Sequence, residues 1–395
     1  MDDDPVVELV ARRPSAGDDD PERLRTLLEL LDRPDQVSTT IWVEGPYGGG
    51  STVAMVAALL TALNITTGTV TTSHLQDLRE RIRIAGSAIG SHALREQLAY
   101  LDPFLREVDT RFAEPLAFDE VLFALAMTWF ADAPVDVVVA QGAPPPTARC
   151  DIHARLGEGH GRPSLLVGND TVGSDTGVSE RELAVGGQQV SLVGITTRTS
   201  DVYLPLHGAH QAENAAVALS TVDLLTGDRL PHGLDADLVR DAFARVRLPG
   251  RLEVVRRTDG ASVVLDAAHD AATASALCFA LSQEFAVRHR IGVVGVGRSD
   301  PVLFLEALAP ALDHVVVTAS PEANAAPPAA VLAAARELGL PAESADTVDA
   351  AIDSATGVAT AEDLVVVAGG AQTVGAARRA LRLDPLEELL AAPDS

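Results

Sequence analysis

The chain has 395 residues, with 30 basic and 56 acidic side chains and a formal net charge of −26. This charge argues against nucleic acid and anionic membranes as general partners, because both repel an acidic surface. The length is enough for two domains that each bury a core. No apolar run approaches the roughly 18 residues of a membrane span, and the acidic start Met-Asp-Asp-Asp is unlike a secretion signal. We therefore expect a cytoplasmic, two-domain protein.

The first half of the chain predicts a strand–loop–helix unit behind an acidic tail. Residues 1–20 are acidic, contain Pro and Gly, and are expected to form a mobile tail. Leucines at helical spacing then predict a helix over 21–31. An apolar strand at 40–43 leads through a glycine-rich turn into an apolar helix at 53–63. Further elements expected here are strands at 67–71 and 135–140 and helices at 91–107 and 116–131.

The second half predicts another α/β unit. Residues 142–177 are rich in Pro and Gly with little periodicity, and are expected to form a loop. Short alternating strands follow within 182–206, then a helix at 209–225, and the chain enters a new domain near 247–251. Beyond it, strands near 262–266, 291–296, 314–318 and 363–368 alternate with helices near 270–285, 302–311, 326–338, 347–357 and 372–382. The predicted fold is α/β, with a parallel-sheet domain at 21–248 and a doubly wound domain at 249–395.

The glycine-rich turn resembles a phosphate-binding loop. Residues 45–52 read Gly-Pro-Tyr-Gly-Gly-Gly-Ser-Thr and lie between a predicted strand and a helix. Such a loop directs backbone N–H groups and a helix N-terminus at an anion. Nucleotide-hydrolysing enzymes place a lysine near its end, but the residue here is Gly49, and all 30 basic residues are arginines. The sequence predicts phosphate contacts without that cation; the alternative is a glycine turn kept only for the fold.

Several segments resemble the folylpolyglutamate synthase/dihydrofolate synthase family of the Mur ligase superfamily. They are the first helix (25–34), the loop with its preceding Glu (44–52), Thr-Ser-His-Leu with the stretch after it (68–82), His-Gln-Ala-Glu-Asn (210–214), Pro-Gly-Arg-Leu-Glu (249–253), Asp-Ala-Ala-His (266–269) and Thr-Val-Gly (373–375). The resemblance implies a two-lobed Mur-ligase-like fold. It also implies a ligase that uses ATP and two Mg²⁺ ions to phosphorylate a folate or pteroate carboxylate, to which glutamate is then joined.

The resemblance also assigns roles to residues of this chain. Nucleotide contacts would come from Gly45, Gly48, Gly50, Ser51, Thr52, Asn214, Arg251, Asp266 and His269. Mg²⁺ would be held by Ser51 and Thr72, and a folate or pterin by Thr72, His74 and Arg81. Other interpretations stay open, since lone histidines such as His74, His210 and His269 are usually structural. The alternating Arg79, Arg81 and Arg83 could also form a solvated face.

The departures from the family pattern concern phosphoryl transfer. Gly49 replaces the loop lysine, and Gln141 replaces a metal-binding glutamate at a strand end. Asp270 replaces an asparagine, and the segment after Gly142 lacks the family's His and carbamylated Lys. These departures argue against tight binding of ATP and Mg²⁺ and predict no catalytic residues.

We hypothesise that the chain is a pseudoenzyme. It would keep a cleft the size of a nucleotide, a folate or a pterin, or would regulate an active paralogue. The first alternative is an active ATP-dependent ligase in which Arg149, Arg155 or Arg162 supplies the charge. The second is a purely structural subunit of an active paralogue.

Overall fold

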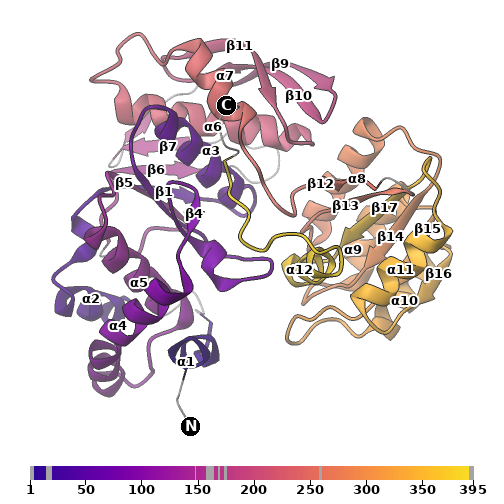
Figure 1. The fold of residues 1–395 in the computed structure, drawn as a ribbon, viewed down its shortest axis with the longest axis horizontal. Helices are drawn as coiled ribbons and strands as arrows, with labels where there is room; N and C mark the ends of the chain where they lie inside the picture. The colour runs from indigo at the N-terminus through magenta and orange to yellow at the C-terminus, as the bar shows by residue number, and fades with distance from the viewer. Residues whose placement is uncertain are drawn as a thin grey trace.

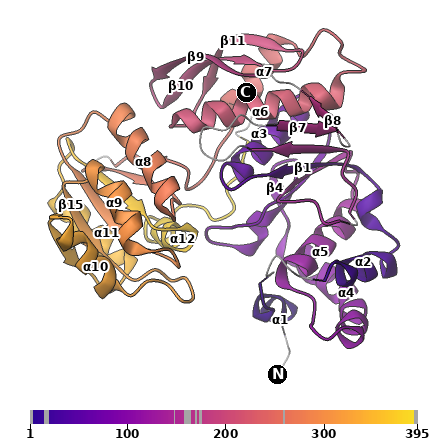
Figure 2. The same ribbon diagram turned by 180° about the vertical axis from the view of Figure 1, so that it is seen from behind.

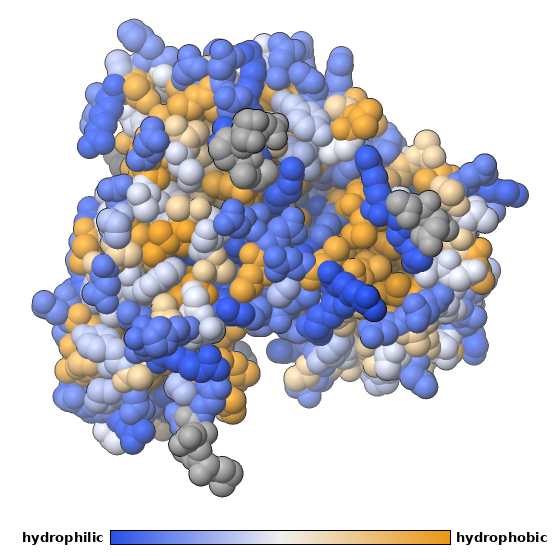
Figure 3. Space-filling view, in the orientation of Figure 1, coloured by the Kyte–Doolittle hydropathy of each residue, from blue (hydrophilic) through white to orange (hydrophobic). Residues whose placement is uncertain are grey.

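The computed structural model describes residues 4–14, 20–146, 148–156, 164–167, 170–172, 176–257 and 260–390. Figure 1 shows two lobes, with the N-terminal lobe in indigo to pink and the C-terminal lobe in orange to yellow. Within the described part of the chain, no helix is both long and apolar enough to span a membrane. Hydrophilic side chains cover much of the face in Figure 3, as the acidic composition leads one to expect.

The N-terminal lobe is built on an eight-stranded sheet of order β4-β3-β2-β5-β1-β6-β7-β8. Strands β2, β5, β1 and β6 run parallel, and the strands at either edge are antiparallel. The strands are β1 (Thr39–Glu44), β2 (Thr67–Val70), β3 (Ile82–Ile84), β4 (Ser87–Ala88), β5 (Val137–Gln141), β6 (Ile152–Arg155), β7 (Ser164–Val167) and β8 (Asp170–Val172).

Helices cover both faces of this sheet (Figures 1 and 2). Strand β1 explains why, since Ile41 and Val43 join a core with α3 and α6, whereas Trp42 joins a second core with α4 and α5. A strand that is apolar on both sides needs a helix layer on each. The helices of this lobe are α1 (Pro5–Ala11), α2 (Pro21–Leu30), η1 (Pro34–Gln36), α3 (Gly49–Ala62), η2 (Leu78–Arg81), α4 (Ser91–Arg111), α5 (Phe118–Asp132), α6 (Ala209–Thr226) and α7 (Ala236–Ala244).

A small antiparallel sheet of order β11-β10-β9 lies against α6 and α7. Its strands are β9 (Gly177–Ala184), β10 (Gly187–Val193) and β11 (Arg198–Leu204). Val190, Leu192, Val202 and Leu204 alternate inward and join the core that contains α3 and α6.

The C-terminal lobe has a six-stranded sheet of order β12-β13-β17-β14-β15-β16, parallel except for β12. Helices α8, α9 and α10 pack on one face, and α11 and α12 pack on the other. The strands are β12 (Glu253–Val255), β13 (Ser262–Leu265), β14 (Arg290–Val294), β15 (His314–Val317), β16 (Ala342–Ser344) and β17 (Leu364–Ala368). The helices are α8 (Ala271–Glu284), α9 (Pro301–Leu308), η3 (Ala309–Ala311), α10 (Pro328–Glu337), α11 (Val348–Val358) and α12 (Ala371–Ala380).

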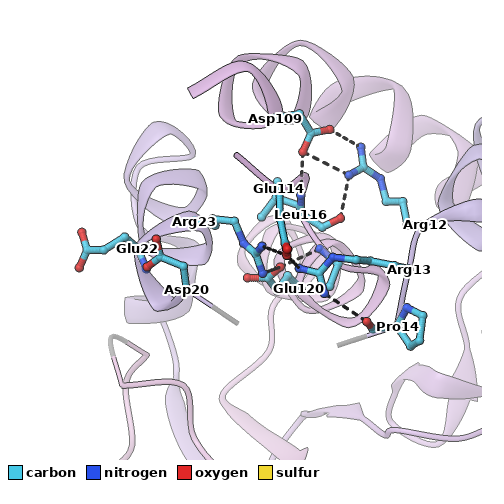
Figure 4. Close-up of polar contacts among 11 residues, drawn as sticks. Arg12, Arg13, Pro14, Asp20, Glu22, Arg23, Asp109, Glu114, Leu116 and Glu120 are labelled. Carbon is cyan, nitrogen blue, oxygen red and sulfur yellow. Dashed lines mark hydrogen bonds and ion pairs between the residues drawn. The ribbon is translucent and has the colours of Figure 1, made fainter. Parts of the chain in front are cut away.

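The structure departs from the expected mobile tail at residues 1–20. Helix α1 lies inside this segment, capped by Asp4, whose carboxylate accepts from Val6 N at 3.0 Å. Arg12 anchors the helix through Asp109 at 2.8 Å. Figure 4 shows this contact beside Arg23, which is 2% exposed and paired with Glu120 at 3.2 Å. The acidic composition led to the expectation of a mobile tail, because it gave no indication of the helix cap at Asp4 or of the Arg12–Asp109 ion pair. Residues 1–3 and 15–19 lie outside the described residues.

Two other expectations need correction. The expected loop at 142–177 contains β6, β7 and β8, because β6 pairs with β1 and extends the main sheet. Helix α7 was not predicted, although Asp235 caps it by accepting from Asp237 N and Leu238 N. The placement of the domain boundary near residue 248 stays a prediction.

The lobes are joined by more than the chain connection. Leu75, from the loop after β2, is buried in the core of the C-terminal lobe. After α12 the chain returns to the N-terminal lobe, as the yellow trace in Figure 1 shows. There Leu390 pairs with Val246, and Arg247 N donates to Leu389 O at 2.7 Å.

Candidate functional site

The phosphate loop connects the end of β1 to the start of α3. Gly48 has φ +79°, a left-handed conformation that glycine adopts easily, and precedes the first residue of the helix. A Cβ atom there would lie 2.5 Å from Asn214 Oδ1, so α6 packs directly on the loop. The helix's first hydrogen bond runs from Thr52 N to Gly48 O at 2.9 Å. The N–H groups of Gly49, Gly50 and Ser51 therefore precede the helical ladder, in the geometry that binds anions.

Gln141 occupies the space beside the loop. It ends β5, the strand next to β1, and pairs in register with Val43. A Cβ atom on Gly49 would lie 3.1 Å from Gln141 Nε2, and one on Gly50 would lie 3.4 Å from Gln141 Oε1. Gln141 Oε1 also accepts from Thr72 N at 3.2 Å. The fold thus gathers the loop, Thr72, Gln141 and Asn214.

The groups at this point do not fit Mg²⁺. Two predicted ligands, Ser51 and Thr72, are neutral hydroxyls, and the amide oxygen of Gln141 already accepts a hydrogen bond. Mg²⁺ in proteins is held by charged carboxylates together with phosphates and water. Among the residues that the structure describes, no three His, Cys, Asp and Glu side chains are placed to hold a metal ion. We therefore derive no step that passes through a metal.

The groups do fit a phosphate bound through the backbone. Ser51 is 3% exposed, and Thr52 Oγ1 is buried without a hydrogen-bond partner in the first turn of the helix. A buried hydroxyl without a partner costs free energy, which a ligand oxygen would recover. The loop can therefore hold an anion by N–H groups and hydroxyls.

His74 and Arg81, both predicted substrate residues, contact each other. Arg81 Nε donates to His74 Nδ1 at 2.9 Å, and its Nη1 donates to Asp119 at 3.1 Å. The guanidinium lies over the Phe118 ring, 4.9 Å from its centroid. Burial lowers the pKa of His74, and the charge of Arg81 lowers it further. His74 is thus a neutral acceptor, whose proton is on Nε2.

The solvated-face interpretation of Arg79, Arg81 and Arg83 is wrong for two of the three. Arg81 is held in the cluster just described. Arg83 is 3% exposed and donates to Gly86 O and to Glu387 O at 2.9 and 3.1 Å. The strand β3 turns this side chain toward the returning C-terminal segment, so Arg83 is structural.

Three predicted or considered residues meet at the hinge. Asp266 accepts from Leu252 N and Ala268 N, both at 2.9 Å. Burial raises the pKa of Asp266, an effect opposed by the charges of Arg251 and His210. Burial lowers the pKa of His210. Asp266 thereby ties the start of the C-terminal lobe at Leu252 to the turn after β13, with Arg251 and His210 near it.

His269 lies more openly at the edge of the C-terminal lobe. Its side chain is 55% exposed, and Nε2 lies 3.9 Å from Asp270 Oδ2. Asp270 in turn accepts from Tyr47 of the phosphate loop at 2.9 Å. Sequence reasoning missed this contact between the lobes, because the two residues are 223 positions apart and no local pattern joins them.

Of the arginines offered as substitutes for the lysine, only one is close to the loop within the described residues. Arg155, 55% exposed, pairs with Glu44 at 3.1 Å at the carboxyl end of β6. Arg149 pairs with Asp151 at 2.7 Å and donates to Gln36 O, at the other end of that strand. Arg162 lies outside the described residues.

Comparison with known proteins agrees with this architecture. Residues 250–371 match the family model for the Mur ligase glutamate ligase domain. The dihydrofolate synthase/folylpolyglutamate synthase of Mycobacterium tuberculosis is 32% identical over 440 aligned positions, covering 92% of this chain and 90% of the relative. The chain belongs to the folylpolyglutamate synthase/dihydrofolate synthase family. The aligned length exceeds the 395 residues of this chain, so the relative contains segments that this family member lacks.

Solved structures confirm the predicted fold class. The folylpolyglutamate synthase of Mycobacterium tuberculosis complexed with ADP superposes with a TM-score of 0.85 at 30% identity, covering 96% of this chain and 98% of the other. The enzyme from Lactobacillus casei, at 22% identity, has a TM-score of 0.76 and covers 95% and 98%. The latter likeness supports the fold alone.

Proposed function

We propose that this family member binds a nucleotide at the phosphate loop and does not carry out the glutamate-adding reaction for which its relatives are named. The observation that carries the proposal is the position of Gln141. A neutral carboxamide lies against Gly49 and Gly50, so this point of the site offers backbone N–H groups but neither a lysine nor a carboxylate.

The lost charges affect nucleotide binding less than phosphoryl transfer. Loss of one charge-assisted contact costs about 1.5–3 kcal/mol in binding, which backbone N–H groups partly offset. In a phosphoryl-transfer transition state the lost charge matters more, because removing a single stabilising group costs roughly 10²–10³ in rate. The site has changed at two such positions, Gly49 and Gln141. Binding is therefore expected to survive where catalysis does not.

The experiment measures binding by calorimetry and thermal shift with AMP, ADP and ATP. In Gly49→Asp, the new Cβ atom would lie 3.1 Å from Gln141 Nε2, the end of a side chain that can shift, and the carboxylate would add negative charge at the loop. Binding should therefore fall, and thermal unfolding verifies that the fold is kept. Gly357→Asp is the matched control, since a Cβ atom there meets nothing within 4 Å. Equal affinity of wild type and Gly49→Asp for every nucleotide would contradict the proposed site.

The second candidate is an active ligase in which Arg155 replaces the lysine, which its place beside Glu44 allows. Arg155 would have to leave that ion pair to reach a phosphate. In this case a Mg²⁺-dependent, glutamate-containing product would form and would be lost in Arg155→Gln. We expect no such product.

A further inference from the structure

The phosphate loop carries an acidic neighbour from the other lobe. The hydroxyl of Tyr47 donates to Asp270 Oδ2, while Asp270 Oδ1 accepts from Thr273 N at 2.9 Å and so caps helix α8. Burial raises the pKa of Asp270, but the hydrogen bonds from Thr273 and Tyr47 outweigh it and bring the pKa below its ordinary value. Asp270 is therefore a fixed negative charge one tyrosine side chain away from the loop.

This contact borders a pocket of about 400 Å³. Apolar atoms come from Ala271, Ala272 and Leu303, and polar ones from Tyr47, Ser299, Asp270 and Asp300. The volume lies in the range of small-molecule pockets, roughly 300–1,000 Å³. Asp300 caps α9 by accepting from Val302 N and Leu303 N, so its carboxylate is fixed as well.

The pocket and the loop differ in charge, since carboxylates line the pocket whereas the loop presents backbone N–H groups. Two carboxylates and no arginine are among the residues lining the pocket, and Arg298, which precedes Ser299 in the sequence, pairs with Glu322 at 2.9 Å. The pocket therefore suits an uncharged body with hydroxyl or amino donors. The loop beside it suits a phosphate. Negative charge beyond one phosphate would be repelled by the pocket carboxylates, because salt screens charges only partly when they are closer than a Debye length, about 8 Å.

We propose that the combined site selects a ligand with a single phosphate on a donor-bearing body, and that Asp270 is the residue that disfavours longer phosphate chains. This inference rests on the proposed function and specifies its ligand class. A nucleoside monophosphate has the required parts, with ribose hydroxyls as donors for a carboxylate and one phosphate for the loop. Each further phosphate adds negative charge at a loop that borders Asp270 and has no lysine to balance it.

The test compares adenosine, AMP, ADP and ATP by calorimetry in EDTA, with wild type and Asp270→Asn. Asparagine caps helices as well as aspartate does through its single oxygen, and its Nδ2 can donate to the Tyr47 hydroxyl in place of the lost acceptor, so the substitution removes the charge with little change of shape. Asp235→Asn is the matched control, because Asp235 also caps a helix, α7, in the other lobe. Thermal unfolding of each variant verifies that the fold is kept.

We expect wild type to bind AMP more tightly than adenosine and at least as tightly as ATP. Asp270→Asn should tighten ATP relative to AMP by roughly tenfold, and Asp235→Asn should leave the ratio unchanged. The inference is overturned if wild type prefers ATP, or if Asp270→Asn leaves the ATP-to-AMP ratio as it was. If AMP binds no better than adenosine and no phosphate form binds at all, the proposed function itself fails.

Discussion

Arg378 in helix α12 donates a hydrogen bond through Nε to Gln76 Oε1 of the N-terminal lobe, at 2.9 Å. Arg378 is 1% exposed and also pairs with Glu253 and donates to Asp384 O. Next to it, a Cβ atom on Gly375 would overlap the carbonyl group of Leu75. The loop after β2 is thus seated on α12, and the two lobes share one packed interface near the hinge.

The close approach at Gly375 predicts a large effect of one methyl group. Gly375→Ala places a Cβ atom 2.6 Å from the carbonyl carbon of Leu75, which is backbone and cannot turn aside. We expect a loss of about 1–3 kcal/mol in the free energy of unfolding, measured by urea denaturation. Gly357→Ala in α11 is the control and should be neutral or stabilising, because alanine favours helix. Similar results for both variants would show that the interface is loosely packed.

The net charge of −26 predicts stabilisation by salt. Repulsion among like charges opposes the compact state, and salt screens it. The melting temperature should rise when KCl is increased from about 0.05 M to about 1 M. Sucrose is the control for general exclusion effects, since it does not screen charge. A melting temperature that is unchanged or falls with KCl would mean that charge repulsion is not a significant part of the stability.

Asp363 predicts a stability difference that depends on pH. Hydrogen bonds from Thr360 N and Oγ1, together with His289, hold the pKa of Asp363 down to about 2. Since this pKa is below that of the unfolded chain, the stabilisation is present above about pH 4 and is lost as pH falls through about 2. Asp363→Asn should therefore be less stable than wild type near pH 6, and the gap should narrow toward pH 3. Urea denaturation across this pH range measures the difference in the free energy of unfolding between the two proteins. A difference that stays constant would contradict the lowered pKa of Asp363.

Restoring the changed residues should recover nucleotide affinity. Gly49→Lys alone crowds Gln141, whose Nε2 would lie 3.1 Å from the new Cβ atom. Gly49→Lys combined with Gln141→Glu returns a cation to the phosphates and an anion to the metal. The affinity for ATP with Mg²⁺ should rise roughly tenfold or more over wild type, without ligation. Calorimetry measures the affinity, and glutamate-containing product from the double variant would show that the missing segment is not required.

The sequence predicted most of the fold because its signals are local. The strands β1, β5, β13, β14 and β17 are short apolar runs between helical patterns, a texture typical of buried parallel strands. The strands β6, β7 and β8 escaped prediction because they lie among prolines and glycines and are held by pairing to β1 rather than by their own periodicity. Helix α1 was hidden by composition, although the Asp-Pro pair at residues 4 and 5 is a helix-start signal.

The candidate site was predictable only in part. The glycine loop, Gln141 and Asn214 each follow from motif and element position, and the structure brings them together. The Tyr47–Asp270 contact depends on how distant elements meet, which a single sequence does not show. His74 and Arg81 are only seven positions apart, but their contact depends on the path of the loop between them. Gly49 and Asp270, which set the charge at the site, were recognisable in the sequence as departures from the family that the chain resembles. The contact of Asp270 with Tyr47 was not recognisable there.

The most direct measurement is a mass-spectrometric search for a glutamate-containing product. The protein is incubated with ATP, Mg²⁺, glutamate and either a folate or dihydropteroate, and the same samples are assayed for ADP. We expect no product and no ADP above the level of a protein-free control, in a preparation that binds nucleotide by calorimetry. A Mg²⁺-dependent product that disappears in Gly49→Asp but persists in Gly357→Asp would contradict it.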